Sequence, residues 1–354
     1  MELTHVPPTD PPPLTVSRYG PTGASARARV YDWLDHLGIR AERCQYLGTA
    51  NNKASTLLRR IPDVARAEMS LRRLGAGIRN RTLIMSRGAS PLSSGAVEDS
   101  LLRQARHSVY DFDDAIFLQR KGLLQQVWSE KRVWQKAVAA ADVVVAGSEI
   151  LAEAASAVRK DVVMIPTCVD PKDYRKKQTY EISRDPRAVW IGTPSTEGFL
   201  RTIEDALLTL NRLKGLRLTV ISAGQTSLGP LDSMVTRLDW APDTFQDQLA
   251  NADFGLMPLP DAPFERGKCA YKLLQYGAAG LPVIGSPVGA NVSALTKLGG
   301  ISASTGKQWV GSVAAILDAS QVERAELGAA ARDGVERHFS FAAWAATWRA
   351  ATGL

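Results

Sequence analysis

Two lysines four residues apart, Lys268 and Lys272, follow a glycine in a segment whose residue types suit an anion. Gly267 lets the backbone approach a ligand closely. The residues after it have helical spacing, and a helix starting here would direct its free N–H groups and positive dipole end at that ligand. Two like charges on one face near a helix start are unfavourable unless something negative is bound. The segment therefore predicts a diphosphate site, although solvated lysines in a first helical turn have the same pattern.

Three carboxylates gather after another apolar run, His107–Asp111, which has the pattern of a strand. Asp111, Asp113 and Asp114 would repel one another, so we expect some of them to pair with cations or with the hydroxyls of a bound sugar. A helix N-cap would account for one of them by itself.

Two glycine turns after predicted strands have residue types that suit phosphate oxygens. One turn contains Gly192, Thr193, Ser195 and Thr196, and the other contains Gly23, Ser25 and Arg27. A plain helix cap is the alternative for the hydroxyl residues. Arg27 and Arg29 both lie off the apolar face of the helix predicted over 28–37, which also suits surface side chains. Arg27 is nearer the turn and is therefore the better candidate for an acceptor or phosphate contact.

Taken together, these segments resemble the donor-site region and flanking motifs of group-1 (family 4) retaining glycosyltransferases of the GT-B fold. The resemblance covers residue 14 to the end of the chain and is most specific in the second half. It is carried by the runs 23–29, 110–115, 190–196, 258–261, 265–276 and 280–291.

The resemblance implies an α/β fold of two doubly wound Rossmann-like domains that face each other across a cleft. It implies transfer of a sugar from a nucleotide diphosphate sugar, such as a UDP- or GDP-sugar, to a hydroxyl or amine with retention of configuration. In that scheme the departing β-phosphate helps to deprotonate the acceptor. Polysaccharide, glycolipid and antibiotic biosynthesis all use such transfers. Catalysis is mainly electrostatic, and no metal or other cofactor is required.

The same resemblance assigns roles to individual residues. Asp113, Lys268 and Lys272 are the expected catalytic residues, and Asp113 occupies the position at which a polar group touches the donor sugar. Acceptor contacts are expected from Ser25, Arg27 and Asp114. Donor contacts are expected from Gly23, Gly192, Thr193, Ser195, Thr196, Trp240, Asp261, Glu265, Arg266, Gly267 and Gln275. For Trp240, a place near the nucleotide base and a place in the core are both open.

The chain departs from the family at a pair of glutamates separated by seven residues. Gly267 stands at the first position and Gln275 at the second. Glutamine can still hydrogen-bond ribose hydroxyls, and Glu265 or Asp261 is the expected substitute for the missing sugar contact. The departure leaves alternatives open: a catalytically inactive GT-B paralogue that serves as a binding subunit, a sugar-nucleotide epimerase, or a pseudo-glycosidic coupling enzyme.

Composition limits the class of protein. A length of 354 residues suits two domains, and 45% hydrophobic with 22% charged residues is typical of a soluble globular protein. The most apolar run, near 137–147, is too short to span a membrane, and the N-terminus shows no secretory signal. Three distant cysteines and four scattered histidines support neither disulfides nor a metal site. We expect a cytoplasmic protein with the proline-rich segment 7–13 as a disordered leader.

Short apolar runs alternate with helical spacing along the chain, which predicts parallel sheets covered on both faces. The pattern predicts two domains, over 14–168 and 187–340, with a linker over 169–186. The family resemblance implies that the first domain binds the acceptor and the second the donor, and that helix 341–354 packs back on the first domain. The predicted strands are 14–16, 81–85, 107–111, 142–146, 161–165, 188–192, 218–222, 254–258 and 283–286.

The net charge of +7 is concentrated in residues 53–87, where nine Lys and Arg face two acidic residues. Such a segment attracts anionic membranes, nucleic acid or phosphorylated substrates. Nucleic acid is disfavoured because no aromatic residue is interleaved for base stacking, and a solubilising helix face is the alternative. We therefore expect a small-molecule or lipid-linked acceptor and peripheral contact with the inner face of an anionic membrane.

Overall fold

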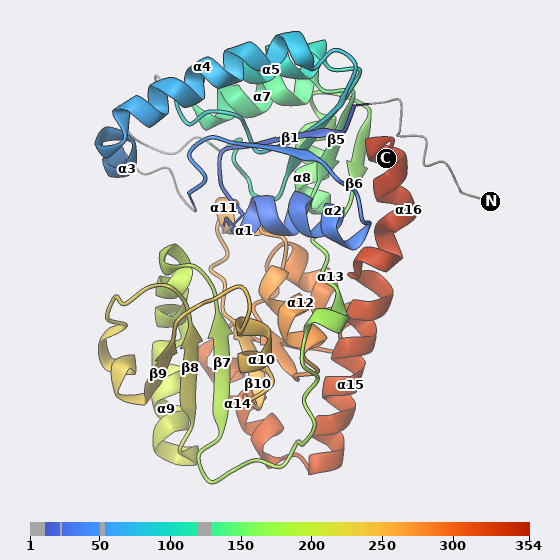
Figure 1. Ribbon diagram of the computed structural model, residues 1–354. Helices are drawn as coiled ribbons and strands as arrows, with labels where there is room; N and C mark the ends of the chain where they lie inside the picture. Colours follow the sequence, from blue (N-terminus) through green and yellow to red (C-terminus); the bar gives the residue numbers. More distant parts are fainter. Residues whose placement is uncertain (1–10, 22, 50–53, 119–128) are drawn as a thin grey trace, which may run out of the picture. The chain divides into compact units, whose positions relative to one another are not determined.

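The computed structural model describes residues 11–21, 23–49, 54–118 and 129–354. The chain divides into two compact units, Met1–Pro166 together with Ala345–Leu354, and Thr167–Trp344. Within the described residues, each unit contains one parallel six-stranded sheet (Figure 1). Lys53 of the basic segment and residues 7–10 of the proline-rich segment lie outside these ranges. The two-domain Rossmann-like α/β fold expected from the sequence is confirmed.

The sheet of the first unit has the order β2-β1-β3-β4-β5-β6. The order reverses between β1 and β3, which makes their carboxyl ends the topological switch point where doubly wound folds bind ligands. The strands are β1 (Leu14–Ser17), β2 (Glu42–Gln45), β3 (Thr82–Ser86), β4 (His107–Phe112), β5 (Val143–Ala146) and β6 (Val162–Met164). The helices are α1 (Ala24–Ala26), the π-helix η1 (Arg27–Tyr31), α2 (Asp32–His36), α3 (Ala54–Arg59), α4 (Ile61–Gly77), α5 (Ala96–Gln104), α7 (Glu130–Ala140) and α8 (Glu149–Ser156).

The sheet of the second unit has the order β12-β11-β10-β7-β8-β9, so its switch point lies between β7 and β10. The strands are β7 (Arg187–Ile191), β8 (Arg217–Ile221), β9 (Val235–Leu238), β10 (Phe254–Met257), β11 (Val283–Gly285) and β12 (Ile301–Ser302). The helices are η2 (Pro171–Asp173), η3 (Pro194–Ile203), α9 (Glu204–Lys214), η4 (Gly229–Met234), α10 (Phe245–Leu249), α11 (Pro263–Arg266), α12 (Tyr271–Ala278), α13 (Ala290–Lys297), α14 (Gly306–Asp318) and α15 (Gln321–His338).

Buried apolar runs form the central strands of both sheets. Val144 and Ala146 of β5, and Val189 and Trp190 of β7, have no exposed surface. A strand that is covered on both faces by helices reads as a continuous apolar run rather than an alternating one. Two helices of the second unit, α14 and α15, begin with a local capping motif. Thr305 and Ser320 each begin a helix with a reciprocal capping box.

The final helix, α16 (Phe341–Thr352), spans the boundary between the units in sequence, and residues from Ala345 onward belong to the first unit. There, Trp348 stacks on Trp33 with ring centroids 5.4 Å apart. His107 Nε2 lies 2.9 Å from the carbonyl oxygen of Ala351. These contacts bury one face of the C-terminal residues against the first sheet and its helices.

The segment predicted as a linker, 169–186, belongs to the second unit. The Lys177 ammonium donates to the Ala252 carbonyl at 2.7 Å, and the Tyr180 hydroxyl donates to the Gly280 carbonyl at 2.7 Å. Burial lowers the pKa of Lys177, although the charge of Asp253 opposes the shift. The segment is therefore fixed to the second unit by buried polar contacts.

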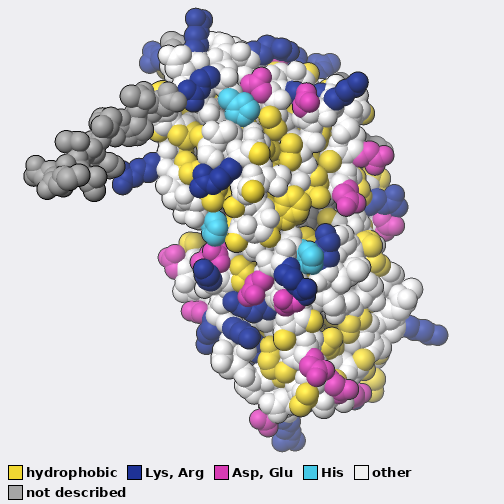
Figure 2. Space-filling model, turned by 90° about the vertical axis from the view of Figure 1, so that its right-hand side faces the viewer, with side chains coloured by type: hydrophobic (Ala, Val, Ile, Leu, Met, Phe, Trp, Pro, Cys, Tyr) yellow, Lys and Arg dark blue, Asp and Glu magenta, His cyan; other side chains and the backbone are white. Residues whose placement is uncertain are grey.

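Within the ranges that the structure describes, no helix has both the length and the apolarity needed to cross a bilayer. Figure 2 shows basic side chains among the residues at the surface of the molecule. Of the basic segment, Arg59, Arg66, Arg72 and Arg73 are exposed, so this segment forms part of the outer surface of the first unit.

Candidate functional site

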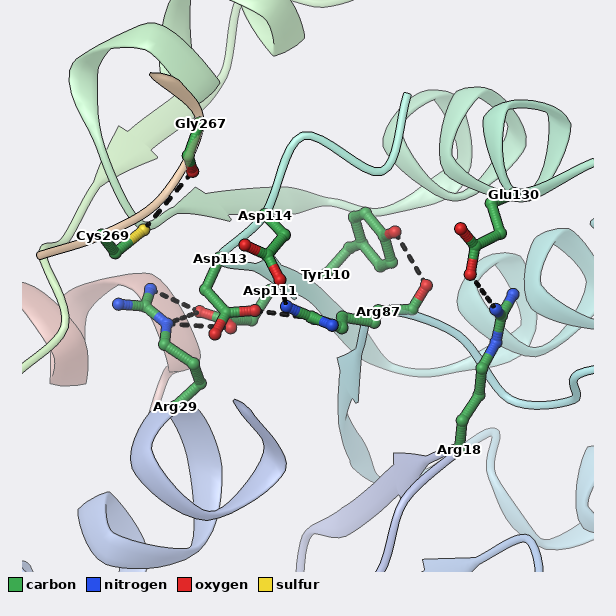
Figure 3. Close-up of polar contacts among 10 residues, drawn as sticks. All are labelled: Arg18, Arg29, Arg87, Tyr110, Asp111, Asp113, Asp114, Glu130, Gly267 and Cys269. Atoms are coloured by element: carbon green, nitrogen blue, oxygen red, sulfur yellow. Dashed lines mark hydrogen bonds and ion pairs between the residues drawn. The ribbon is translucent and has the colours of Figure 1, made fainter. Parts of the chain in front are cut away.

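The three parallel strands β1, β3 and β4 are neighbours in the first sheet, so their carboxyl ends lie side by side, and this row of carboxyl ends is the sheet edge meant below. The turn before α1 follows β1, Arg87 follows β3, and the aspartates occupy the end of β4 and the residues after it. Because these ends meet at the switch point, the polar side chains gather there (Figure 3).

Arg29 and Asp111 form a buried ion pair close to the carboxyl end of β4. The guanidinium donates to both carboxylate oxygens at 2.7–3.2 Å and to the Ile165 carbonyl at 2.9 Å (Figure 3). Burial raises the pKa of Asp111, and the charge of Arg29 opposes that shift. Asp111 therefore lies inside β4 in a structural pair, not beyond the strand as the sequence suggested. The surface alternative for Arg29 is wrong, because Arg29 is only 2% exposed.

Arg87 holds the other two carboxylates. Its Nε donates to Asp113 at 2.7 Å, and its Nη2 pairs with a carboxylate oxygen of Asp114 (Figure 3). Burial by itself would lower the pKa of Arg87, but the charges of Asp113 and Asp114 outweigh it and hold the pKa well above its ordinary value. The expectation that some of the three carboxylates pair with cations is confirmed.

The backbone at Arg87 is strained. Its φ is 60°, and in the described part of the chain only Arg87 and Ala270 combine a Cβ with a left-handed φ. Such a conformation costs about 1–3 kcal/mol and persists where the surroundings impose it. Here the Arg87 N–H donates to the Asp111 carbonyl at 2.9 Å, and the Tyr110 hydroxyl donates to the Arg87 carbonyl at 3.0 Å. These bonds to β4 fix the guanidinium beside Asp113.

Arg87 is the main residue of this site that sequence reasoning missed. In the sequence Arg87 stands out only as the last charge of the basic segment 53–87. The available signal was its position directly after the run 81–85, the same position after a predicted strand that drew attention to the other candidates.

The turn after β1 contains the remaining candidates of the first unit. Gly23 is buried and precedes α1, and its N–H donates to the Gly20 carbonyl at 2.9 Å. Ser25 in α1 and Arg27 in η1 are half-buried. Arg27 Nε lies 4.0 Å from an oxygen of Asp32. The structure thus places all three at the β1 end of the same sheet edge.

The lysines of the second unit follow β10, and their setting differs from the predicted one. Lys268 precedes α12, which begins at Tyr271 after Ala270 in a left-handed conformation with φ 55°. The prediction that both lysines lie one turn apart on one helix face is therefore wrong, because the helix begins too late. Lys268 places its ammonium 5.1 Å from the Phe264 ring centroid, and Lys272 lies in the first turn of α12.

Two glycines bring neighbouring strand ends close to this segment. A Cβ on Gly192, after β7, would lie 2.4 Å from the Trp190 ring and 2.9 Å from Cε of Lys272. The Lys272 ammonium lies 5.3 Å from the centroid of that ring. Gly289, after β11, has φ 56°, and a Cβ there would lie 2.1 Å from the Arg266 carbonyl oxygen. The ends of β7, β10 and β11 are thus in close contact around Lys272 and α11.

The hydroxyl residues after β7 form a bonded group at the start of η3. Thr193 Oγ1 lies 3.0 Å from Ser195 Oγ and 3.4 Å from Thr196 Oγ1, and Thr196 Oγ1 donates to the Thr193 carbonyl at 3.0 Å. Thr193 is the residue before η3, but its side chain makes no capping hydrogen bond. Thr193 and Ser195 are exposed, and the strand order places both residues at the same ends of the strands as the lysines.

The other candidates of the second unit differ in accessibility. Exposed Asp261 forms an ion pair with Arg266 at 2.5 Å, and the hydrogen bond from that guanidinium lowers the pKa of Asp261. Glu265 is half-buried in α11. Gln275 is only 3% exposed. Gly267 is buried, and the Cys269 thiol lies 4.0 Å from its carbonyl oxygen (Figure 3).

Trp240 follows β9 and is partly buried against the core of the second unit. Its ring stacks on Phe245 with centroids 5.7 Å apart and planes 25° apart. The core contact is therefore present, and a contact with a nucleotide base stays a prediction.

Within the described ranges, no three His, Cys, Asp or Glu side chains lie close enough to hold a metal ion together. The carboxylates nearest the first switch point are instead bonded to arginines. That the transfer reaction needs no metal ion stays a prediction, which the assay under "Proposed function" tests.

We expect Arg29→Met to destabilise the protein by about 3–5 kcal/mol, because it leaves the Asp111 carboxylate buried without its partner. Chemical denaturation measures the change. Arg103→Met is the matched control, since Arg103 pairs with Asp99 on the exposed face of a helix of the same unit and such pairs contribute about 0.3–0.5 kcal/mol. Equal effects of the two substitutions would show that the Arg29–Asp111 pair has no structural role.

Comparison with known proteins identifies the fold. No protein-family model matches the chain, and no curated protein sequence matches it. Among solved structures, Anabaena HepE in complex with UDP-glucose superposes with a TM-score of 0.67 at 14% identity, covering 95% of this chain and 99% of HepE. WaaG, a glycosyltransferase involved in lipopolysaccharide biosynthesis, superposes with a TM-score of 0.64 at 15% identity, covering 96% of this chain and 99% of WaaG.

TarM of S. aureus gives a TM-score of 0.61 at 12% identity over 80% of this chain, which spans only 57% of the length of TarM. The chain therefore has the two-domain Rossmann-like α/β fold found in GT-B glycosyltransferases.

Proposed function

We propose that this protein is a nucleotide-sugar-dependent glycosyltransferase that retains the anomeric configuration of the donor sugar. One observation carries the proposal: Lys268, Lys272 and the hydroxyl group of residues 193–196 all follow strands that end at one switch point. Doubly wound folds bind nucleotides at such points. Support from outside the chain comes from a shared fold with HepE, which was solved with UDP-glucose.

The second unit would hold the nucleotide diphosphate. Two ammonium groups and the free N–H groups of α12 would stabilise the negative charge that grows on the diphosphate as it leaves. Thr193 and Ser195 would donate to phosphate oxygens, and buried Gln275 with Trp240 would lie toward the ribose and base. Asp261, Glu265 or Arg266 would contact the sugar hydroxyls. Gly23 would complete the donor contacts.

The first unit would supply Asp113 as the carboxylate beside the anomeric carbon. Its charge would stabilise the positive charge that develops there, while Arg87 fixes its position. Ser25, Arg27 and Asp114 would contact the acceptor. The acceptor is a small molecule or a lipid-linked intermediate, and the reaction takes place in the cytoplasm without a metal ion.

The test is a transfer assay on the purified full chain with UDP-glucose and a panel of other UDP- and GDP-sugars. We expect release of nucleoside diphosphate that persists in a chelator, and a product whose anomeric configuration by NMR equals that of the donor. Binding of nucleotide sugars without transfer or hydrolysis would instead support a binding subunit, which the missing glutamates at Gly267 and Gln275 motivate. An epimerised donor would support an epimerase.

A further inference from the structure

The outer surface of α3 and α4 combines exposed apolar side chains with arginines. Leu58, Ile61 and Met69 are 70%, 61% and 47% exposed. The other large exposed apolar residues of the described chain, Ile150, Val158, Leu213, Val292 and Val322, are scattered in sequence over α8, α9, α13, α15 and a loop. Scattered exposed apolar residues are ordinary, whereas a group of them marks an interaction surface.

The position of α4 is fixed by its inner face. Leu71 is 2% exposed, and the Glu68 carboxylate accepts hydrogen bonds from the Tyr46 hydroxyl at 2.8 Å and from the Ser90 hydroxyl. α4 also packs on α5 (Figure 1). With the inner face held in this way, the opposite face of α4 is directed to solvent.

The outer face has the pattern of a helix that lies in a membrane interface. Ile61, Ala65 and Met69 are spaced four residues apart and form one apolar line. The exposed arginines Arg66 and Arg73 lie beside that line on the helix surface, and Arg72 continues it after Met69. An apolar line bordered by arginines is typical of helices that insert among lipid headgroups.

The charge of this face favours an anionic occupant. Asp63 and Glu68 are the acidic residues of α3 and α4, and both are engaged: Asp63 pairs with Arg60 and Arg66, and Glu68 bonds inward. In the described part of the chain, Arg59, Arg72 and Arg73 have no acidic partner.

We propose that the α3–α4 face, formed by Leu58, Ile61, Ala65, Met69 and the arginines Arg59, Arg66, Arg72 and Arg73, docks on an anionic lipid bilayer. The arginines bind the lipid phosphates, and the three large apolar side chains enter the headgroup region. Docking on lipid does not depend on the transferase reaction, since no residue of the α3–α4 face belongs to the switch-point sites. A contact made by charge alone would leave Leu58, Ile61 and Met69 without a role.

The experiment measures co-sedimentation of the full chain with vesicles of phosphatidylcholine alone or mixed with phosphatidylglycerol. We expect binding to the mixed vesicles only, weakening as salt screens the charges. Arg59→Gln/Arg72→Gln/Arg73→Gln should lower the partition coefficient roughly fivefold per arginine, about 100-fold together. Leu58→Ser/Ile61→Ser/Met69→Ser should lower it by about tenfold or more at unchanged net charge.

A matched control is Leu213→Ser/Val322→Ser, which removes two equally exposed apolar residues from the second unit and should leave binding unchanged. Absence of binding to phosphatidylglycerol vesicles at low salt would overturn the proposal. The proposal would also be overturned if the arginine variant bound vesicles more weakly while the apolar variant bound as the unaltered protein does. An equal loss of binding in the control variant would overturn it as well. A dimer in sedimentation velocity that the apolar variant dissociates, without vesicle binding, would assign the face to a second copy instead. Transfer to a soluble acceptor should be the same in all of these variants, which separates docking from catalysis.

Discussion

Asp113→Asn should reduce turnover by about 10²–10³-fold, the scale for one electrostatic contact in a closed site. Asparagine keeps the shape of the side chain and can still accept the hydrogen bond from Arg87, so the change removes little except the charge. Nucleoside diphosphate affinity should change much less than turnover, because the expected contact is with the sugar. Steady-state kinetics together with calorimetric binding of the nucleotide separate the two effects.

The matched control is Asp161→Asn. Asp161 also pairs with an arginine, Arg159 at 3.2 Å. Because Asp161 precedes β6, it lies at the amino ends of the strands, opposite the carboxyl ends that form the switch point. Normal turnover in Asp113→Asn with loss in Asp114→Asn would show that the neighbouring carboxylate acts instead. If both variants turn over normally, the two aspartates serve only to neutralise Arg87.

Lys268→Ala and Lys272→Ala should each weaken the binding of nucleoside diphosphate by about 1.5–3 kcal/mol, the range for hydrogen bonds to charged groups. The reason is that each ammonium follows the end of β10, where the phosphates are expected. Lys272 also contacts the Trp190 ring, so a change in folding stability has to be measured alongside affinity.

Lys297→Ala controls for the loss of a cation above an aromatic ring. Lys297 lies 5.4 Å from the Phe339 ring centroid in the last turn of α13, away from the carboxyl ends of the strands. It should leave nucleotide affinity unchanged. Unaltered affinity in both Lys268→Ala and Lys272→Ala, with the fold intact, would remove the diphosphate assignment.

The sequence predicted the central strands well because burial on both faces leaves a plain apolar signal, as in Val143–Ala146. It missed β2, β9 and β12, which lie at sheet edges or consist of two residues. Glu42–Gln45 reads Glu-Arg-Cys-Gln and has no apolar run to detect. Such a strand is held by pairing with its neighbour rather than by burial on both faces, so its own residues carry little pattern.

The contacts within the candidate sites could not be predicted from the sequence, because they join residues that are distant along the chain. Arg29 and Asp111 are 82 residues apart in sequence, and Arg87 and Asp113 are 26 apart. Only the pairing of β1, β3 and β4 brings them together. The late start of α12 depends on the left-handed backbone of Ala270, and alanine gives no sequence signal for that conformation.

Both sheets also end in strands that are poor templates for aggregation. The edge strands β2, β6, β9 and β12 have only 4, 3, 4 and 2 residues. β2 exposes Glu42 and Arg43, and β9 exposes Thr236 beside half-buried Arg237. Short edges with charged or polar side chains offer few unpaired backbone groups to another chain. Parallel sheets fold slowly and leave such edges open in partly folded states, so these four strands protect the chain during folding as well as afterwards.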